Sequence, residues 1–332
     1  MSPAGLGGGG KVGIAFETTM GTYVPPAVFV PVLSEDVQYM EEKYYSEQIR
    51  QQTIASDVKP APYHVEGPVE MEVDVNNLPY WLYASRHNIT KTGAAAPFTY
   101  KFTPGNQGSA STAASGAVAR TASITIVRNG VVFGYVGCVV GSFEFSISDE
   151  GILLVTMDVL GMGEAVQSAP SPTWIAPQLY GADASQIYLA ASGATPTFSS
   201  ADVNFDGFTF RANYNAEPQN RIRADRQASY ISFGITEAEI ESSLDFMDRT
   251  DYDNMVNNTT RAIKMESTQG GVSFATATHG VKLQGNRVSY DSYEPNLEGM
   301  GDLIIADFTG RMIGVAGGDA YQIEVKTAVN IA

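Results

Sequence analysis

Hydrophobic and polar residues alternate along much of the chain, with the period of two that is typical of a β-strand facing a core on one side and water on the other. The clearest example is residues 69–75, where apolar positions alternate with Glu70, Glu72 and Asp74. Residues 78–83 follow with apolar side chains at helical spacing. The pattern therefore predicts a half-exposed strand and then a short amphipathic helix.

This strand-then-helix unit occurs twice. Residues 65–87 and 235–256 both begin as a strand with acidic residues at alternate positions and continue as a short amphipathic segment. A second pair of similar segments follows in the same order, at 141–162 and at 285–312. Two copies of one β-rich unit favour a ring or a tube over a catalytic cleft.

The length of 332 residues suits two domains of ordinary size. We expect a mainly β fold of two tandem β-sandwich or barrel domains, each with a short flanking α-helix. The first would span 1–164, with an N-terminal arm and a long hairpin loop, and the second 201–332. The Pro- and Ser-rich stretch 165–200 is expected to link them, and the Gly/Ala/Ser/Thr-rich stretch 91–119 to form a mobile loop.

The net charge of −16 argues against a surface that grips nucleic acid, because such affinity comes largely from Lys and Arg. The single cysteine, Cys138, excludes an intramolecular disulfide and lies in an apolar run, which predicts a buried thiol. No basic-then-apolar signal segment opens the chain, and no apolar run approaches the ~20 residues of a membrane helix. We expect synthesis in the cytoplasm and no contact with a membrane.

Catalytic, cofactor-binding and metal-binding patterns are missing from the sequence. Asp202–Gly207 imitates the first half of a calcium loop, but the twelfth position is Asn213 rather than a bidentate Glu. The three histidines are isolated from one another and from Cys or carboxylate groups at metal spacing: His64, His87 and His279. We therefore expect no catalytic residue, no cofactor and no metal.

The acidic strands allow two interpretations. They could keep an outer surface hydrated, or they could line a pore made by copies joined edge to edge in a ring, which would also pair every strand edge. About two dozen tilted strands would close around a lumen of roughly 40 Å, and carboxylates there would repel DNA phosphates. The candidate lumen residues are Glu70, Glu72, Asp74, Glu237, Glu239 and Glu241.

Residues 35–64 predict a hairpin arm, because they are too long and polar for a structureless loop inside a compact domain. The arm is acidic and aromatic, whereas its counterpart in the second half is basic, so the two could connect stacked rings. Plain surface charge balance is the alternative. The candidate contact residues are Glu41, Glu42, Tyr44, Tyr45 and Glu47 on the arm, and Arg211, Arg221, Arg223 and Arg226 on its counterpart.

The chain resembles the tail tube (major tail) proteins of long-tailed bacteriophages. The resemblance lies in Val12–Tyr23 followed by Pro31-Val and the arm, in the strand-to-helix unit from Gly67 to Leu82, and in the Gly141–Gly161 hairpin. It implies a β-sandwich with a flanking helix, assembled into stacked rings that conduct the genome and house a tape-measure protein. It also implies a place in the virion tail, with synthesis in the host cytoplasm.

Most rings of that family are hexamers of a single-domain chain. Because this chain carries two copies, we expect a trimer with pseudo-sixfold symmetry and keep the hexamer as the alternative. Two other functions are consistent with a β-rich chain. One is a phage fibre or another carbohydrate-binding β-sandwich protein, although the sequence has only two tryptophans and no evident aromatic platform. The other is a capsid decoration protein.

Overall fold

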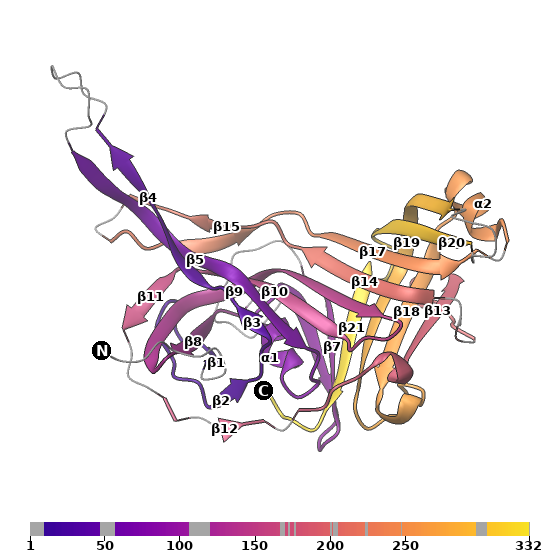
Figure 1. Cartoon of the computed structure of the whole chain (residues 1–332), viewed down its shortest axis with the longest axis horizontal. Coiled ribbons are helices and arrows are strands. Elements are labelled where there is room, and N and C mark those ends of the chain that lie inside the picture. The colour runs from indigo at the N-terminus through magenta and orange to yellow at the C-terminus, as the bar shows by residue number, and fades with distance from the viewer. Residues whose placement is uncertain are drawn as a thin grey trace.

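A computed structural model describes residues 10–46, 57–105, 120–166, 170–171, 173–175, 177–199, 201, 205–222, 225–246, 248–296 and 304–331. The mainly β fold expected from the sequence is confirmed (Figure 1). Two short α-helices accompany the strands in these residues, α1 (Leu78–Tyr83) and α2 (Thr250–Val256), together with the 3₁₀ turns η2 (Ala182–Ala184) and η3 (Gln269–Gly271).

One antiparallel sheet runs through both halves of the chain. Its order is β4 (Gln38–Tyr45), β5 (Val58–Glu72), β10 (Leu154–Gly161), β9 (Val131–Ser148), β14 (Phe205–Asn213), β17 (Glu237–Asp245), β20 (Ile305–Met312) and β19 (Gly280–Asn296). The first four strands come from the first copy and the last four from the second. The two copies repeat the same strand order and join at the β9–β14 pair.

The first halves of the long strands β9 and β19 leave this sheet and build the rest of each copy. In the first copy, β9 pairs with β8 (Ala122–Arg128) and β11 (Gly163–Val166), and β8 leads through β1 (Lys11–Phe16) and β2 (Val28–Val30) to β12 (Thr173–Trp174). In the second copy, β19 pairs with β18 (Arg261–Thr268) and β21 (Tyr321–Thr327), and β18 pairs with β13 (Ser185–Ala191). The long strands thus tie both parts of a copy together.

Strands β6 (His87–Thr92) and β7 (Phe98–Pro104) pair with each other, and β7 pairs with β21 of the second copy. The β6–β7 hairpin of the first copy therefore extends the sheet of the second copy, across the proposed division into 1–164 and 201–332. The predicted linker 165–200 contains strand β13, and the loop prediction for 91–119 is wrong at β7. In β7 apolar residues alternate with polar ones, and the surrounding Gly, Ala, Ser and Thr obscure that signal. Strand β13 shows no such alternation.

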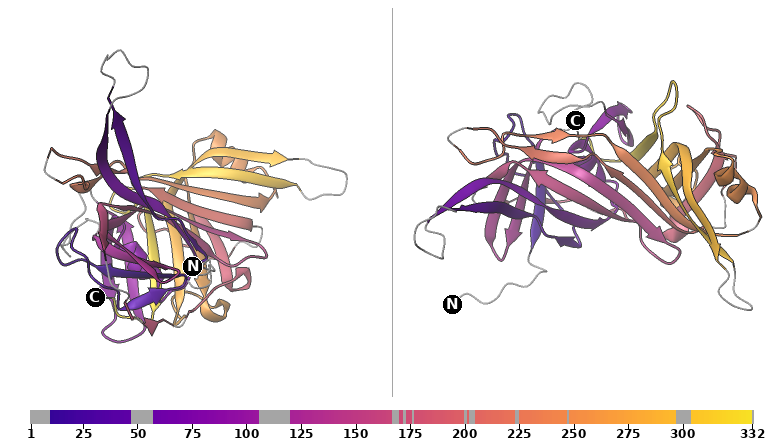
Figure 2. Two further views of the ribbon diagram at one scale, coloured as in Figure 1. Left: turned by 60° about the vertical axis from the view of Figure 1, so that its left-hand side comes forward. Right: turned by 90° about the horizontal axis from the view of Figure 1, so that it is seen from above.

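Three short strands complete the first arm and its counterpart. Strand β3 (Ser34–Glu35) extends the pairing of the arm with β5. The counterpart is a second hairpin, made by β15 (Ala216–Gln219) and β16 (Tyr230–Phe233). Figure 1 and the left panel of Figure 2 show the β4–β5 hairpin projecting from the body of the molecule.

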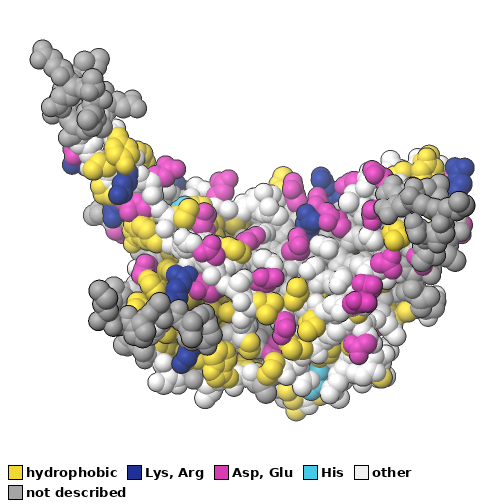
Figure 3. Space-filling view, in the orientation of Figure 1, with side chains coloured by type: hydrophobic (Ala, Val, Ile, Leu, Met, Phe, Trp, Pro, Cys, Tyr) yellow, Lys and Arg dark blue, Asp and Glu magenta, His cyan; other side chains and the backbone are white. Residues whose placement is uncertain are grey.

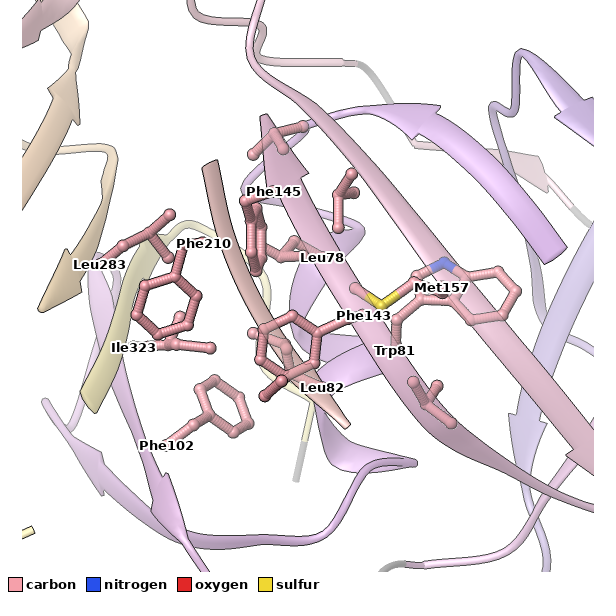
Figure 4. Packing of buried hydrophobic residues seen from close by; sticks show 14 of the residues in the cluster. Leu78, Trp81, Leu82, Phe102, Phe143, Phe145, Met157, Phe210, Leu283 and Ile323 are labelled. Atoms are coloured by element: carbon pink, nitrogen blue, oxygen red, sulfur yellow. The ribbon is translucent and has the colours of Figure 1, made fainter. Parts of the chain in front are cut away.

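The larger of two apolar clusters extends across both copies (Figure 4). Helix α1 contributes Leu78, Trp81 and Leu82, all buried, as its helical spacing predicts. Phe143 from β9 and Phe210 from β14 stack with ring centroids 6.1 Å apart, directly beneath the strand pair that joins the copies. The large buried side chains thus hold the two halves of the long sheet in one fixed arrangement.

Candidate functional site

The strand register places acidic residues of both copies in one row across the long sheet. Glu70 lies opposite Thr156, Thr156 opposite Glu144, Glu144 opposite Arg211, Arg211 opposite Glu239, and Glu239 opposite Arg311. Directly opposed residues of an antiparallel pair share one face of the sheet. A continuous polar row therefore crosses from the first copy to the second without a change of face.

Neighbouring rows extend this polar face. Glu72 and Glu241 lie in the row on one side, and Asp158 and Glu237 lie in the row on the other. We refer to this side of the sheet as the acidic face. Its acidic residues in the central rows are Glu70, Glu72, Glu144, Asp158, Glu237, Glu239 and Glu241, and its basic residues are Arg211 and Arg311. Five of the six candidate lumen residues are thus brought together.

Asp74, the sixth candidate, is not on the acidic face. Strand β5 ends at Glu72, so the alternation no longer applies at Asp74, which is 4% exposed. Its carboxylate accepts hydrogen bonds from the backbone N–H groups of Asn76 and Gln178, both at 3.0 Å, and from the side chain of Asn77. Burial raises the pKa of this carboxyl group despite those bonds. Asp74 therefore holds the turn before α1.

Arg211, predicted as a contact between rings, instead lies near the centre of the acidic face. Its Nη2 is 2.5 Å from Oε2 of Glu241, and its Nε is 3.6 Å from Oε2 of Glu144. Arg311 makes a similar contact, with its Nη2 3.3 Å from Oε1 of Glu239. The two arginines partly offset the carboxylates, and the face remains acidic. In Figure 3 acidic side chains are scattered over the body and basic ones are fewer.

Sequence reasoning missed several members of the face. Glu144 lies between Phe143 and Phe145 in a strand whose alternation was visible, and Asp158 lies two positions after Thr156 in the same kind of pattern. Both were overlooked because each is a single acid on its strand, whereas the neighbouring strands β5 and β17 carry several. The pairing of strands, which the sequence does not display, gathers these isolated acids.

The first arm exposes aromatic side chains. Tyr44 is 59% exposed and Tyr45 63% exposed on β4, and Val58 on the facing strand is 46% exposed. Hydrophobic side chains accordingly gather on the projecting hairpin in Figure 3. Glu42 is also exposed, and Glu47 lies outside the described residues.

On the second hairpin, Arg221 is exposed and its guanidinium lies 5.1 Å from the centroid of the Tyr230 ring. Arg223 lies outside the described residues. Arg221 also donates a hydrogen bond to the carbonyl of Asn220 at 3.1 Å. Its contacts are therefore local to its own hairpin.

Arg226 and Glu41, each a candidate contact residue between rings, form an ion pair with each other within one chain. Arg226 also lies 5.7 Å from the centroid of the Tyr63 ring, and its backbone carbonyl accepts a hydrogen bond from the Tyr63 N–H at 2.9 Å. The Tyr39 hydroxyl donates to Glu41 at 2.7 Å, and burial together with that carboxylate raises the pKa of Tyr39 to about 12. This cluster fastens the second hairpin to the base of the first arm.

His87 is buried where the two copies meet. Its Nε2 lies 3.0 Å from the Tyr214 hydroxyl and 3.3 Å from the Tyr321 hydroxyl, and its Nδ1 lies 2.5 Å from Oγ of Ser85. Burial lowers the pKa of this imidazole to about 3, so it is neutral at ordinary pH. Cys138 is also buried, as predicted, which raises the pKa of its thiol.

Neither a metal site nor a membrane helix emerges from the described residues. No three His, Cys, Asp or Glu side chains gather there in a way that could hold a metal ion. Within the same residues, no helix is long and apolar enough to cross a membrane.

One family model matches the chain. It is described as phage tail tube protein and matches residues 7–312, which include every strand of the long sheet and the β9–β14 junction. No curated protein matches the chain.

Proposed function

Because the chain belongs to the phage tail tube protein family, we propose that its copies join edge to edge into rings, and that these rings stack into the tail tube with the acidic face lining the lumen. Genomic DNA would pass through this lumen during ejection, and a tape-measure protein would occupy it beforehand. The family is structural, so the chain is a component of the virion tail that assembles with copies of itself.

One observation carries the proposal: the polar row from Glu70 to Arg311 stays on one face of a sheet that spans both copies. An outer surface needs no such continuity, whereas a conduit needs the same kind of face all the way round. Carboxylates around a conduit repel phosphates, so a duplex slides without adhering. A lining of Lys and Arg would retain it instead.

The strand count favours three chains in each ring. Each chain supplies eight strands to the long sheet. Three chains would supply about two dozen, and with strands ~4.8 Å apart and tilted, the circumference is on the order of 160 Å, leaving a lumen of roughly 40 Å. Six chains would about double that circumference and leave a lumen far wider than a duplex. We therefore favour the trimer with pseudo-sixfold symmetry over the hexamer.

Stacking of the rings would use the projecting arm. Tyr44 and Tyr45 are too exposed to stabilise the chain by themselves and would be covered by the next ring. Arg221 on the second hairpin, with Arg223 beside it in sequence, is the basic partner we propose for an arm of the adjacent ring. Glu41 and Arg226 would take part only through the cluster that they form within each chain.

Electron microscopy of the purified protein tests this function. We expect hollow tubes from the unaltered chain, and we expect Arg221→Glu with Arg223→Glu to give folded protein that no longer polymerises. Circular dichroism of the double variant checks its folding, and Lys at both positions, which keeps the charge, is the matched control. Discrete particles that bind glycans would instead support the fibre alternative. Normal tubes from the charge-reversed variant would contradict the role of the second hairpin in stacking.

A further inference from the structure

The long sheet ends in two open edges. Among the described residues, β4 is paired only with β5, and β19 beyond Tyr290 is paired only with β20. These edges lie at opposite ends of the sheet (Figure 1). An open edge presents unpaired N–H and C=O groups and is a template for another strand. The β4 edge of one chain could therefore pair with the β19 edge of a second copy of the chain.

The chain contains an example of how one copy joins the next. The second half of β9, the last strand of the first copy, pairs with β14, the first strand of the second copy. In this pair Ser142 lies opposite Asn213 and Glu144 opposite Arg211. The corresponding strands at the two ends of the sheet are the second half of β19 and β4. The internal junction therefore supplies the geometry for a junction between chains.

Two independent features align the copies residue by residue. Strand β9 has a bulge opposite β10 between Val140 and Ser142, and β19 has one opposite β20 between Tyr290 and Ser292. Superposing the bulges makes Ser142 equivalent to Ser292. The alignment passes from β9 and β19 through their paired strands to β5 and β17. It places the ends of β5 and β17 at equivalent positions, and a helix follows shortly after each of these ends, which is the second feature.

The alignment also fixes the equivalent positions on the first strand of each copy. It matches Glu66 on β5 with Glu239 on β17. Gln38 lies opposite Glu66, and Arg211 lies opposite Glu239, so Gln38 is the equivalent of Arg211.

We propose that, in the ring assembly on which this inference rests, β4 of one chain pairs antiparallel with the second half of β19 of the next chain. Met40 would then lie opposite Ser292, and Gln38 opposite Glu294. This is the internal register transferred to the boundary between chains. Tyr39, 38% exposed, would then lie opposite the buried Tyr293 and be covered on the core side. Aromatic cross-strand pairs stabilise such ladders.

The two junctions would differ in charge. At the internal one the Arg211 guanidinium contacts Glu144 and Glu241. At the proposed one Gln38 replaces the arginine beside Glu294 and Glu66, so the guanidinium of the internal junction has no equivalent at this position. The boundary between chains would depend on backbone pairing and on the tyrosines.

Disulfide mapping on assembled tubes tests this register. Opposed residues have Cβ atoms about 4.5–5.5 Å apart and diagonal neighbours are about 7–8 Å apart, whereas a disulfide needs about 3.5–4.5 Å. Chains carrying Met40→Cys are mixed with chains carrying Ser292→Cys, assembled, oxidised and run on a non-reducing gel. Met40→Cys with Glu294→Cys is the diagonal control, and Gln38→Cys with Glu294→Cys is a second matched pair. The buried Cys138 stays in place.

We expect about ten-fold more linked dimer from each matched pair than from the diagonal control. Tubes that form without these links, or that link equally in the control, overturn the register and leave the tail tube function standing. If the unaltered chain itself forms no tubes, the proposed function fails, and this inference fails with it.

Discussion

At the scale of single residues, buried polar groups fix the packing within the first copy and between the two copies. Glu17 is 4% exposed, and its carboxylate accepts hydrogen bonds from the Gly137 N–H at 2.7 Å, the Gly21 N–H at 2.8 Å and Oγ of Ser123 at 3.0 Å. A buried carboxylate is stable only with such partners. His87 of the first copy is similarly buried between the copies, where it contacts the hydroxyl groups of Tyr214 and Tyr321 from the second copy.

The acid sensitivity of the fold should depend on His87. Its folded-state pKa of about 3 lies below the ~6.5 of an unfolded histidine, so the unfolded state binds a proton that the folded state excludes. The free energy of unfolding should therefore fall by about 1.4 kcal/mol per pH unit as the pH drops from ~6.5 toward ~3. His87→Phe should lose this part of the slope. Urea unfolding of both proteins between pH 7 and pH 4 measures it, and equal slopes would contradict the assignment.

At the scale of elements, strands with several acids could be predicted from the sequence, and their pairing could not. The alternation in β5 and in β17 indicates which residues of each strand share a face. Only the strand register shows that the acidic residues of both strands lie on the same face of the long sheet. Asp74 lies off the acidic face because β5 ends at Glu72, an end that the period of two does not mark. Arg211 lies on β14 within the acidic face, because β14 continues into the second hairpin without a break in composition that would separate the two.

The cluster that joins the two hairpins should restrain the first arm. Arg226→Ala removes the ion pair with Glu41 and the contact with Tyr63, so amide hydrogen exchange in Gln38–Tyr45 should become several-fold faster. Arg221→Ala is the matched control, since its described contacts lie within its own hairpin. Mass spectrometry of the exchanged peptides gives the result. Equal exchange in both variants would mean that the cluster does not hold the arm.

At the scale of the whole molecule, the sign of charge on the acidic face should decide whether DNA slides or adheres. We expect tubes carrying Glu70→Lys with Glu239→Lys to retain duplex DNA at low salt and to release it steeply as salt rises. Tubes of the unaltered chain should not retain it. Glu150→Lys with Glu164→Lys makes the same charge change outside the face and is the control. Co-sedimentation measures binding, and equal retention by both variants would place the acidic face away from the conduit.

The β9–β14 pair has a further consequence for assembly from dilute solution. Its two strands belong to one polypeptide, so they meet at an effective concentration set by the chain and not by the number of molecules present. Every second boundary in a closed ring would then already exist when a molecule finishes folding. Only the remaining boundaries would require collisions, so rings could nucleate while the subunit is still scarce in the infected cell.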